Sequence, residues 1–269
     1  MLELYHHGTS VCAAKVRFAL MEKGLKWEGR YVDILAGDQF KPDYVKLNKK
    51  AVVPTLVDDG QVIVESTVIC EYLDDRFPEN PIRPPSAYGR AGLRIWTKIV
   101  DEQLHPVMGE ITYVSALRHT LLRKDPKELT EFLDSRPPAG VSTHWHERRK
   151  TIVREGFSTP GIEHGFIVFN QYMQQLEDAL AAGPWILGES FSLADIALAP
   201  YISRMELLGM SGLWVPHRPN IAGWLSRIKA RPAFKTAISD WCPPPLLKDL
   251  STFGSQSWPM VERILQTAN

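Results

Sequence analysis

AVVPTLVDDGQVIVES, residues 51–66, is the stretch that decides the fold of this chain. A proline stands just ahead of a short apolar run at 55–57, and a second apolar run at 62–64 ends in Glu65 and Ser66. The residues between the two runs include an Asp-Gly pair, which is a hairpin signal, so we expect two antiparallel strands. An acid and a hydroxyl then open residues 66–76, which we expect to form a helix.

The dipeptide Val53-Pro54 is a candidate cis peptide in a tight turn. Such a turn would keep Val53 out of the strand pairing, so its backbone N–H and C=O would remain for an extended ligand. Glu65 and Ser66 add a carboxylate, a hydroxyl and the free N–H groups of a helix start. Together these groups suit both the ammonium and the carboxylate of an amino acid, as a γ-glutamyl peptide presents them.

The residues ahead of this stretch predict a β-α-β unit. Residues 2–5 and 27–34 have the pattern of strands, and residues 11–23 have helical spacing up to Gly24, a C-cap signal. We expect about one helical turn in the polar segment 37–50. The order β-α-β and then β-β-α predicts a thioredoxin-like α/β domain, with a right-handed connection between its parallel strands.

Everything after the proline-rich run at 78–85 predicts helices. We therefore expect a thioredoxin-like domain at 1–80, a linker at 81–88 and an all-α domain at 89–269. Within the last we expect the following features: a helix at 91–111 interrupted near Pro106, a short helix at 126–134 in a polar loop that runs to 149, helices at 162–181 and 220–230, and no regular helix at the start of the tail, 243–245.

Composition bounds the function. The 269 residues are 44% hydrophobic and 23% charged, and the formal net charge is +0, so no global field favours nucleic acid or an anionic membrane. The chain has only three cysteines, a small and odd number that argues against a disulfide framework and suits a reducing compartment. We see neither a signal peptide nor an apolar stretch long enough for a bilayer, so we expect a cytoplasmic enzyme.

Three segments, taken in order, resemble the cytosolic glutathione transferase superfamily. They are YHHGTSVCAAKVR at 5–17, VVPTL at 52–56 and ESTVICEYL at 65–73. The middle motif alone would be weak, but all three at this spacing are specific, and the resemblance covers nearly the whole chain. It implies glutathione as cosubstrate, a homodimer and a helical domain that carries a hydrophobic substrate pocket.

Ser10 is the first candidate catalytic residue because it stands where the first strand ends and the first helix begins. A hydroxyl there can donate to a bound thiolate, and the helix N-terminus adds partial positive charge. In such surroundings a thiol pKa of about 8.5 falls to roughly 3.5–7.5, which supplies a nucleophile without a general base. The alternative is that Ser10 only caps the helix.

Cys12 is the second candidate because it lies in the first turn of the same helix, where a thiol is also acidified. It would form a mixed disulfide with glutathione, and its alternative is a small residue packed at the helix start. In relatives with a C-x-x-C motif the two cysteines fall at Ser10 and Ala13, so disulfide reductase chemistry is not expected. The Ser-x-Cys pattern followed by Val16-Arg17 also resembles the zeta class of transferases.

The resemblance also implies contacts to glutathione. Val53, next to Pro54, would bond its cysteinyl backbone, and Glu65 and Ser66 would bind its γ-glutamyl end. Weaker candidates are Gln39, Lys41 and Lys50 for the glycine carboxylate and Asp101 for the amine. The sequence departs from the family at 48–51, where Asn-Lys-Lys-Ala replaces the usual Asn-Pro-x-Gly.

Two further groups of residues resemble catalytic or metal-binding residues, but their sequence context does not favour such a role. Asp195 follows Ser192 at the spacing of a capping box, so we assign it to folding. His144 and His146 lie two apart in a polar segment without further ligands at metal spacing, so we expect no metal site.

The electrophile is less defined. Candidates for the walls of the hydrophobic pocket are Met108, Tyr113, Tyr201 and Trp214. Residues 66–73, 95–102 and 148–150 resemble bacterial glutathione-dependent β-aryl etherases, which implies cleavage of lignin-type ethers in aromatic metabolism or detoxification. Two alternatives remain: a thiol transferase or peroxidase that acts through Cys12, and a scaffold that binds glutathione without catalysis.

Overall fold

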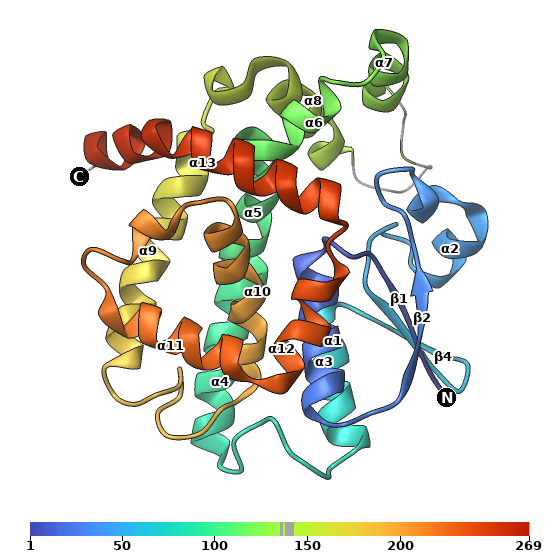
Figure 1. The fold of residues 1–269 in the computed structure, drawn as a ribbon. Helices are drawn as coiled ribbons and strands as arrows, with labels where there is room; N and C mark the ends of the chain where they lie inside the picture. Colours follow the sequence, from blue (N-terminus) through green and yellow to red (C-terminus); the bar gives the residue numbers. More distant parts are fainter. Residues whose placement is uncertain (135–136, 138–142, 269) are drawn as a thin grey trace.

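The computed structural model describes residues 1–134, 137 and 143–268 (Figure 1). Its N-terminal part alternates strands and helices in the order predicted. The elements are β1 (Leu2–His6), α1 (Val11–Glu22), β2 (Trp27–Tyr31), α2 (Pro42–Leu47), β3 (Thr55–Asp58), β4 (Gln61–Val64) and α3 (Ser66–Arg76). The predicted turn of helix at 37–50 is α2 with one preceding 3-10 turn, Asp38–Phe40.

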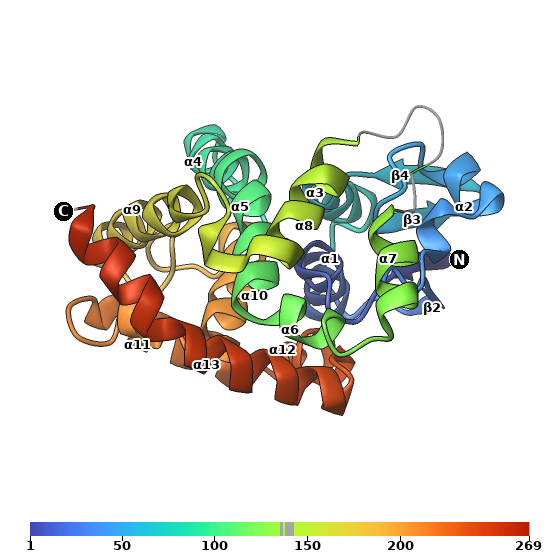
Figure 2. The ribbon, with the colours of Figure 1, turned by 90° about the horizontal axis from the view of Figure 1, so that it is seen from above.

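The four strands form one mixed sheet in the order β2-β1-β3-β4. β1 pairs parallel with β2 and antiparallel with β3, which pairs antiparallel with β4. In both ribbon views α1 and α3 lie between the sheet and the C-terminal helices, whereas α2 lies on the outer side (Figures 1 and 2). The thioredoxin-like prediction is confirmed.

The first long helical stretch runs through three α-helices and two π-helical segments. They are α4 (Ala87–Ile99), a π segment at Val100–Leu104, α5 (His105–Thr112), a π segment at Tyr113–Leu117 and α6 (Arg118–Leu121). Ser86 caps α4 through the N–H of Gly89, so the helix begins inside the predicted linker. Pro106 lacks an N–H, and the π segment before it absorbs the mismatch, so the interruption changes the hydrogen-bond spacing without ending the helix.

The predicted polar loop at 125–149 is partly helical. α7 (Pro126–Asp134) confirms the short helix, but α8 (His144–Glu155) replaces the loop predicted up to residue 149. α8 buries His146, Arg149, Ile152 and Val153, a helical repeat hidden from a composition-based prediction by polar residue types. The rest of the predicted loop, residues 135–136 and 138–142, lies outside the described residues.

The remaining helices are α9 (Glu163–Leu180), α10 (Leu193–Leu207), α11 (Pro219–Ala230), α12 (Pro232–Ala237) and α13 (Pro244–Thr267). The prediction of no regular helix at 243–245 was wrong. Pro243 is the N-cap and the next two prolines occupy the first turn, where a missing N–H costs nothing and the fixed φ suits a helix. α13 then crosses the helical part as one long element (Figure 2).

One continuous apolar core joins both parts of the chain. α1 packs against α3, α10 and α12, so the helix that carries Ser10 is enclosed by both parts. The buried Arg17 of α1 donates to the carbonyls of Ala237, His7 and Gly8, and its guanidinium lies 5.1 Å from the Trp241 ring centroid. A β-carbon at Gly8 would lie 2.1 Å from the Trp241 carbonyl, so the loop before Ser10 tolerates no side chain there.

Within the described residues, no helix is long and apolar enough to cross a bilayer.

Candidate active site

Ser10 lies at the N-terminus of α1 with extended backbone angles, and its hydroxyl oxygen accepts a hydrogen bond from the Ala13 N–H at 3.2 Å. The hydroxyl proton has no acceptor in the described part of the chain, so it is free to donate. The residue is half-buried and α1 has no acidic side chain in its first turn. The positive end of α1 and the unused donor of the Ser10 hydroxyl therefore lie at the same place.

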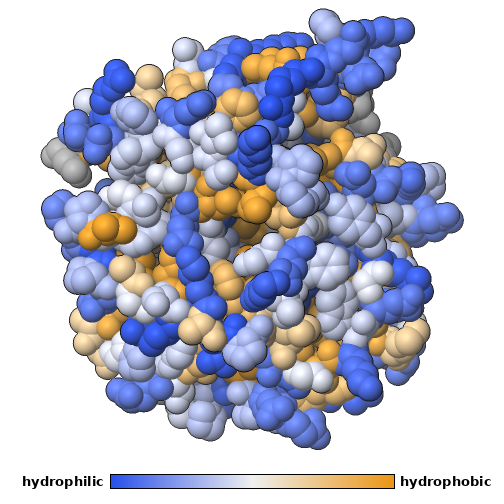
Figure 3. Space-filling view, viewed as in Figure 1, coloured by the Kyte–Doolittle hydropathy of each residue, from blue (hydrophilic) through white to orange (hydrophobic). Residues whose placement is uncertain are grey.

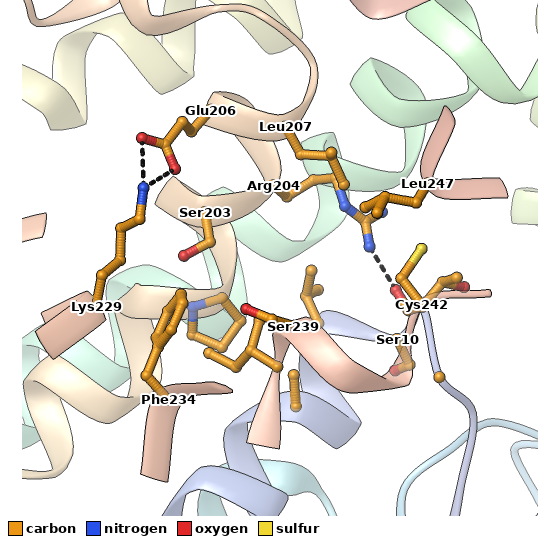
Figure 4. Close-up of a pocket in the computed structure, with 16 residues that line it drawn as sticks. Ser10, Ser203, Arg204, Glu206, Leu207, Lys229, Phe234, Ser239, Cys242 and Leu247 are labelled. Atoms are coloured by element: carbon orange, nitrogen blue, oxygen red, sulfur yellow. Dashed lines mark hydrogen bonds and ion pairs between the residues drawn. The ribbon is translucent and has the colours of Figure 1, made fainter. Parts of the chain in front are cut away.

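A cavity of about 360 Å³ opens beside Ser10. Its walls come from the loop before α1, from α1, α10, α11 and α12, and from the segment that leads into α13 and the first turn of α13. Figure 3 shows a hollow with apolar surface on this face, framed by hydrophilic side chains, and Figure 4 shows the lining in detail. Its apolar members are Val11, Ala14, Pro200, Leu207, Phe234, Ile238 and Leu247. A hydrophobic molecule would therefore lie next to the Ser10 hydroxyl.

Val53 precedes a cis proline, as the sequence predicted. Strand pairing begins only at Thr55, and among the described residues neither the N–H nor the C=O of Val53 makes a hydrogen bond. The preceding carbonyl, that of Val52, is by contrast held by the Tyr44 hydroxyl at 2.6 Å and the Asn48 amide at 2.9 Å. Hydrogen bonds to the Val52 carbonyl thus hold the turn in place, and the backbone N–H and C=O of Val53 remain unpaired.

Glu65 is the N-cap of α3 and has a left-handed backbone, with φ at 68°, although its side chain does not cap the helix. Ser66 follows and is buried. No side chain in the described chain caps this helix, so its first N–H groups remain for a ligand. The Lys50 ammonium lies 2.6 Å from the Glu65 carboxylate, which brings two of the predicted binding residues together.

The weaker candidates are already engaged by the protein. Lys41 is exposed and pairs with Asp38 at 2.6 Å, whereas the Gln39 amide is buried and donates to the Ile34 carbonyl at 3.3 Å. Asp101 accepts at 2.9 Å from the buried ammonium of Lys15. Their contacts to glutathione stay predictions.

Cys12 lies two residues beyond Ser10 but does not line the cavity. Its Sγ is 3.4 Å from Nδ1 of His105 on α5 and 3.6 Å from the Tyr201 hydroxyl on α10, and that hydroxyl is 3.2 Å from the same imidazole nitrogen. Burial raises the pKa of the Cys12 thiol, but the charge and hydrogen bond of His105, together with the charge of Lys15 and the hydrogen bond of Tyr201, outweigh burial and lower the pKa to about 6. The Cys12 thiolate in turn raises the pKa of His105.

Among the described residues, neither of the other cysteines has an imidazole beside it, and the nearby charges of Lys15 at Cys70 and Arg204 at Cys242 do not offset burial. Burial raises the pKa of Cys70 to about 12, and burial also raises that of Cys242. Cys12 is therefore the cysteine whose thiolate is stable at neutral pH, although its side chain is only 9% exposed.

Three of the four predicted pocket residues lie in the core. Met108, Tyr201 and Trp214 are buried, and Tyr201 faces Cys12 and His105. Tyr113 is half-buried and packs edge-on against Trp145, 5.6 Å between ring centroids. None of these four lines the cavity beside Ser10, so their role as substrate walls stays a prediction.

In the described ranges, no group of three or more His, Cys, Asp or Glu side chains could hold a metal ion. His146 is buried and its Nδ1 lies 3.2 Å from the Arg149 guanidinium, a cationic neighbour unsuited to a metal ligand.

Family models match both parts of the chain. One described as glutathione S-transferase, N-terminal domain, matches residues 4–81, and one described as glutathione S-transferase, C-terminal domain, matches residues 159–227. Protein LigF of Sphingobium sp. strain SYK-6 is 33% identical over 241 residues, 87% of this chain and 91% of that protein. The chain belongs to the glutathione S-transferase family. It is a glutathione transferase, and glutathione is its cosubstrate.

Other relatives span the same range. The crystal structure of β-etherase LigF from that strain has a TM-score of 0.78 at 31% identity and covers 89% of this chain and 99% of its own. Glutathione S-transferase Z1 of Arabidopsis thaliana is 46% identical over 239 residues, 89% of this chain and 92% of that protein. Tetrachloro-p-hydroquinone reductive dehalogenase of Sphingobium chlorophenolicum is 30% identical over 248 residues, 88% of this chain and 95% of that protein.

Sequence reasoning missed His105, Ser203 and Arg204. Ser203 and Arg204 follow ten buried residues of α10, so two adjacent polar residues after that buried run were a readable signal. His105 gave no signal, because only the fold brings α5 to the first turn of α1.

Proposed function

We propose that this transferase activates glutathione through Ser10. The tripeptide lies along Val53, its γ-glutamyl end reaches Glu65 and Ser66, and its thiol meets the Ser10 hydroxyl. The observation that carries the proposal is the free hydroxyl proton of Ser10 at a helix N-terminus on the edge of an apolar cavity.

The chemistry requires little more than this donor. The thiol proton leaves to solvent, and the hydroxyl and the positive end of α1 stabilise the thiolate. The sulfur attacks an electrophilic carbon of the molecule in the cavity, so a carbon–sulfur bond forms. The bond from that carbon to the leaving group breaks, and the leaving group departs with its electron pair.

The electrophile we favour is a lignin-type β-aryl ether, because a relative that spans nearly the whole chain is named a β-etherase. The aryloxide would then be the leaving group. With this substrate the protein would act in aromatic metabolism or detoxification, in the cytoplasm and as a homodimer. The proposed division is a glutathione-binding unit at 1–80, a linker at 81–88 and a substrate-binding unit at 89–269.

The test is a pH titration of thiolate absorbance for glutathione bound to the wild type, Ser10→Ala and Ser10→Thr. We expect the wild type to lower the thiol pKa from about 8.5 into roughly the 3.5–7.5 range, Ser10→Thr to keep most of that shift and Ser10→Ala to lose it. If Ser10→Ala binds glutathione with the same low thiol pKa, Ser10 is only a cap and the proposal fails.

A second function is favoured by the contact between Cys12 and His105. The Cys12 thiolate would attack the sulfur of a glutathione disulfide, so a Cys12–glutathione disulfide forms and glutathione thiolate leaves. This function requires a disulfide to reach Cys12, and access is restricted because Cys12 is buried and does not line the cavity.

His105→Gln separates this function from the first. The absorbance of the Cys12 thiolate should rise as pH increases through about 6 in the wild type and only at higher pH in the variant, where Lys15 and Tyr201 alone oppose the effect of burial. Cys70→Ser is the matched control, since a thiol with a pKa of about 12 adds nothing below pH 10. Thiol exchange that survives both Cys12→Ser and His105→Gln would rule out this candidate.

A further inference from the structure

Arg204 brings an unneutralised positive charge to the cavity beside Ser10. Its guanidinium donates to the Thr9 carbonyl at 2.7 Å, which ties α10 to the loop before Ser10. No carboxylate of the described residues lies within ion-pair distance of it. Glu206, which lines the same cavity, is held by Lys229 at 2.9 Å.

The surroundings of Arg204 favour an anion. Burial lowers the pKa of its guanidinium, because protein atoms replace the water that would stabilise the charge. A half-buried cation without an anionic partner is stabilised by a nearby anion, and a planar carboxylate is the partner whose two oxygens match the guanidinium fork. The rest of the cavity wall near it is Leu207, Leu247 and the neutral thiol side chain of Cys242.

Ser203 adds a second unfilled group. Its hydroxyl oxygen is buried and has no hydrogen-bond partner in the described chain. Figure 4 shows this hydroxyl on the side of the cavity near Lys229 and Phe234, whereas the Arg204 guanidinium lies on the opposite side near Cys242 and Ser10. An unpaired buried hydroxyl costs free energy, so a ligand oxygen placed there would be favoured.

We propose that the cavity selects electrophiles that carry a negatively charged oxygen, a carboxylate or a phenolate, with Arg204 as the specificity-determining residue. Arg204 pairs with the anion, the apolar walls enclose the ring, and Ser203 on the opposite side of the cavity meets another polar atom of the ligand. The reacting carbon then faces the thiolate at Ser10. The inference rests on the proposed function, since it names the substrate class of the same site.

The first experiment measures binding and needs no turnover. Calorimetry compares 4-nitrobenzoate with nitrobenzene, two probes that share a ring and differ by one carboxylate, on the wild type, Arg204→Lys and Arg204→Met. We expect the wild type to bind the benzoate at least 10-fold more tightly, Arg204→Lys to retain part of that preference and Arg204→Met to lose it. Arg227→Met is the matched control, because Arg227 lies outside the cavity.

The second experiment measures conjugation. Arg204→Met should raise KM for 4-chloro-3,5-dinitrobenzoate about 10-fold or more and leave that for 1-chloro-2,4-dinitrobenzene nearly unchanged. Equal losses on both electrophiles would mean that Arg204 acts only by holding the Thr9 carbonyl, and a raised KM for glutathione would assign its charge to the peptide. Either result overturns the proposal.

Two outcomes keep this inference separate from the proposed function. A wild type that binds the benzoate no better than nitrobenzene overturns the inference even if Arg204→Met fails to fold. A wild type that binds the benzoate selectively but conjugates neither electrophile upholds the anion site and removes the transferase role assigned to Ser10.

Discussion

α1 and α10 both begin at a serine whose hydroxyl accepts from the helix backbone, Ser10 from the N–H of Ala13 and Ser192 from that of Ala194. The two helix starts differ at the third helical residue. In α10 it is Asp195, which completes a capping box, and in α1 it is Ala13. One cap is therefore closed by its own helix and the other is left open.

The surroundings enlarge that difference. Asp195 is fully buried and accepts from the backbone N–H groups of Ser192 and Ile186 and from the Trp224 indole. Ser10 is half-buried, faces a cavity and keeps its hydroxyl proton. The same local signal thus stabilises the fold where its donors and acceptors are matched, and serves a ligand where one donor is left over.

The largest effect should follow Asp195→Ala, which removes the acceptor of four buried donors: the N–H groups of Ile186 and Ser192, the Ser192 hydroxyl and the Trp224 indole. We expect a loss of about 3–5 kcal/mol in the free energy of unfolding, measured by urea denaturation. Asp195→Asn should lose less, and Asp178→Ala, at an exposed site on α9, should lose almost nothing. The conjugation rate per folded molecule should not change. A loss below 1 kcal/mol would mean that the closed cap is not structural.

Ser10→Ala should give the next effect, on rate. We expect kcat/KM for conjugation to fall about 100-fold, the loss typical of one removed donor to a developing or resident anion. The free energy of unfolding should fall by about 1 kcal/mol, the usual cost of a lost N-cap. If instead stability falls and the rate per folded molecule stays, the two serines have the same role and the contrast is wrong.

Ser192→Ala should give the smallest effect. The expected loss is about 1 kcal/mol in the free energy of unfolding, because Asp195 still accepts from the backbone, with no change in kcat/KM. Thermal denaturation and a conjugation assay on the same preparation measure both. A fall in conjugation comparable with that of Ser10→Ala would show that the start of α10 communicates with the cavity.

Much of the fold was predictable, because its signals are local. Turn residues and helical spacing placed β3, β4, α3 and α9 to within a few residues, and the capping box placed the start of α10. The misses have local causes as well: α8 hides its buried face among polar residue types, and the prolines before α13 occupy the first turn that tolerates them. The division into domains stays a prediction.

The candidate site divides in the same way. Four of the candidate residues belong to short motifs: Ser10, Val53, Glu65 and Ser66. The sequence therefore predicts that they are candidates and that they lie at a helix start or at the cis-prolyl turn. The cavity itself comes from segments nearly 240 residues apart, and neither its volume nor its lining follows from any one of them. The four aromatic and apolar residues predicted as its walls do not line it.

The sequence by itself determined the thioredoxin-like order of strands and helices, the cis-prolyl turn and a serine cap at the start of α1, because each depends on neighbouring residues. Only the tertiary structure decided that Cys12 meets His105 and that Arg204 reaches the Ser10 cavity without a carboxylate. Those contacts depend on how α5 and α10 pack against α1. Electrostatic interactions act over a few ångströms, whereas Cys12 and His105 are 93 positions apart in the sequence and Ser10 and Arg204 are 194 positions apart, so the sequence alone does not show that they meet.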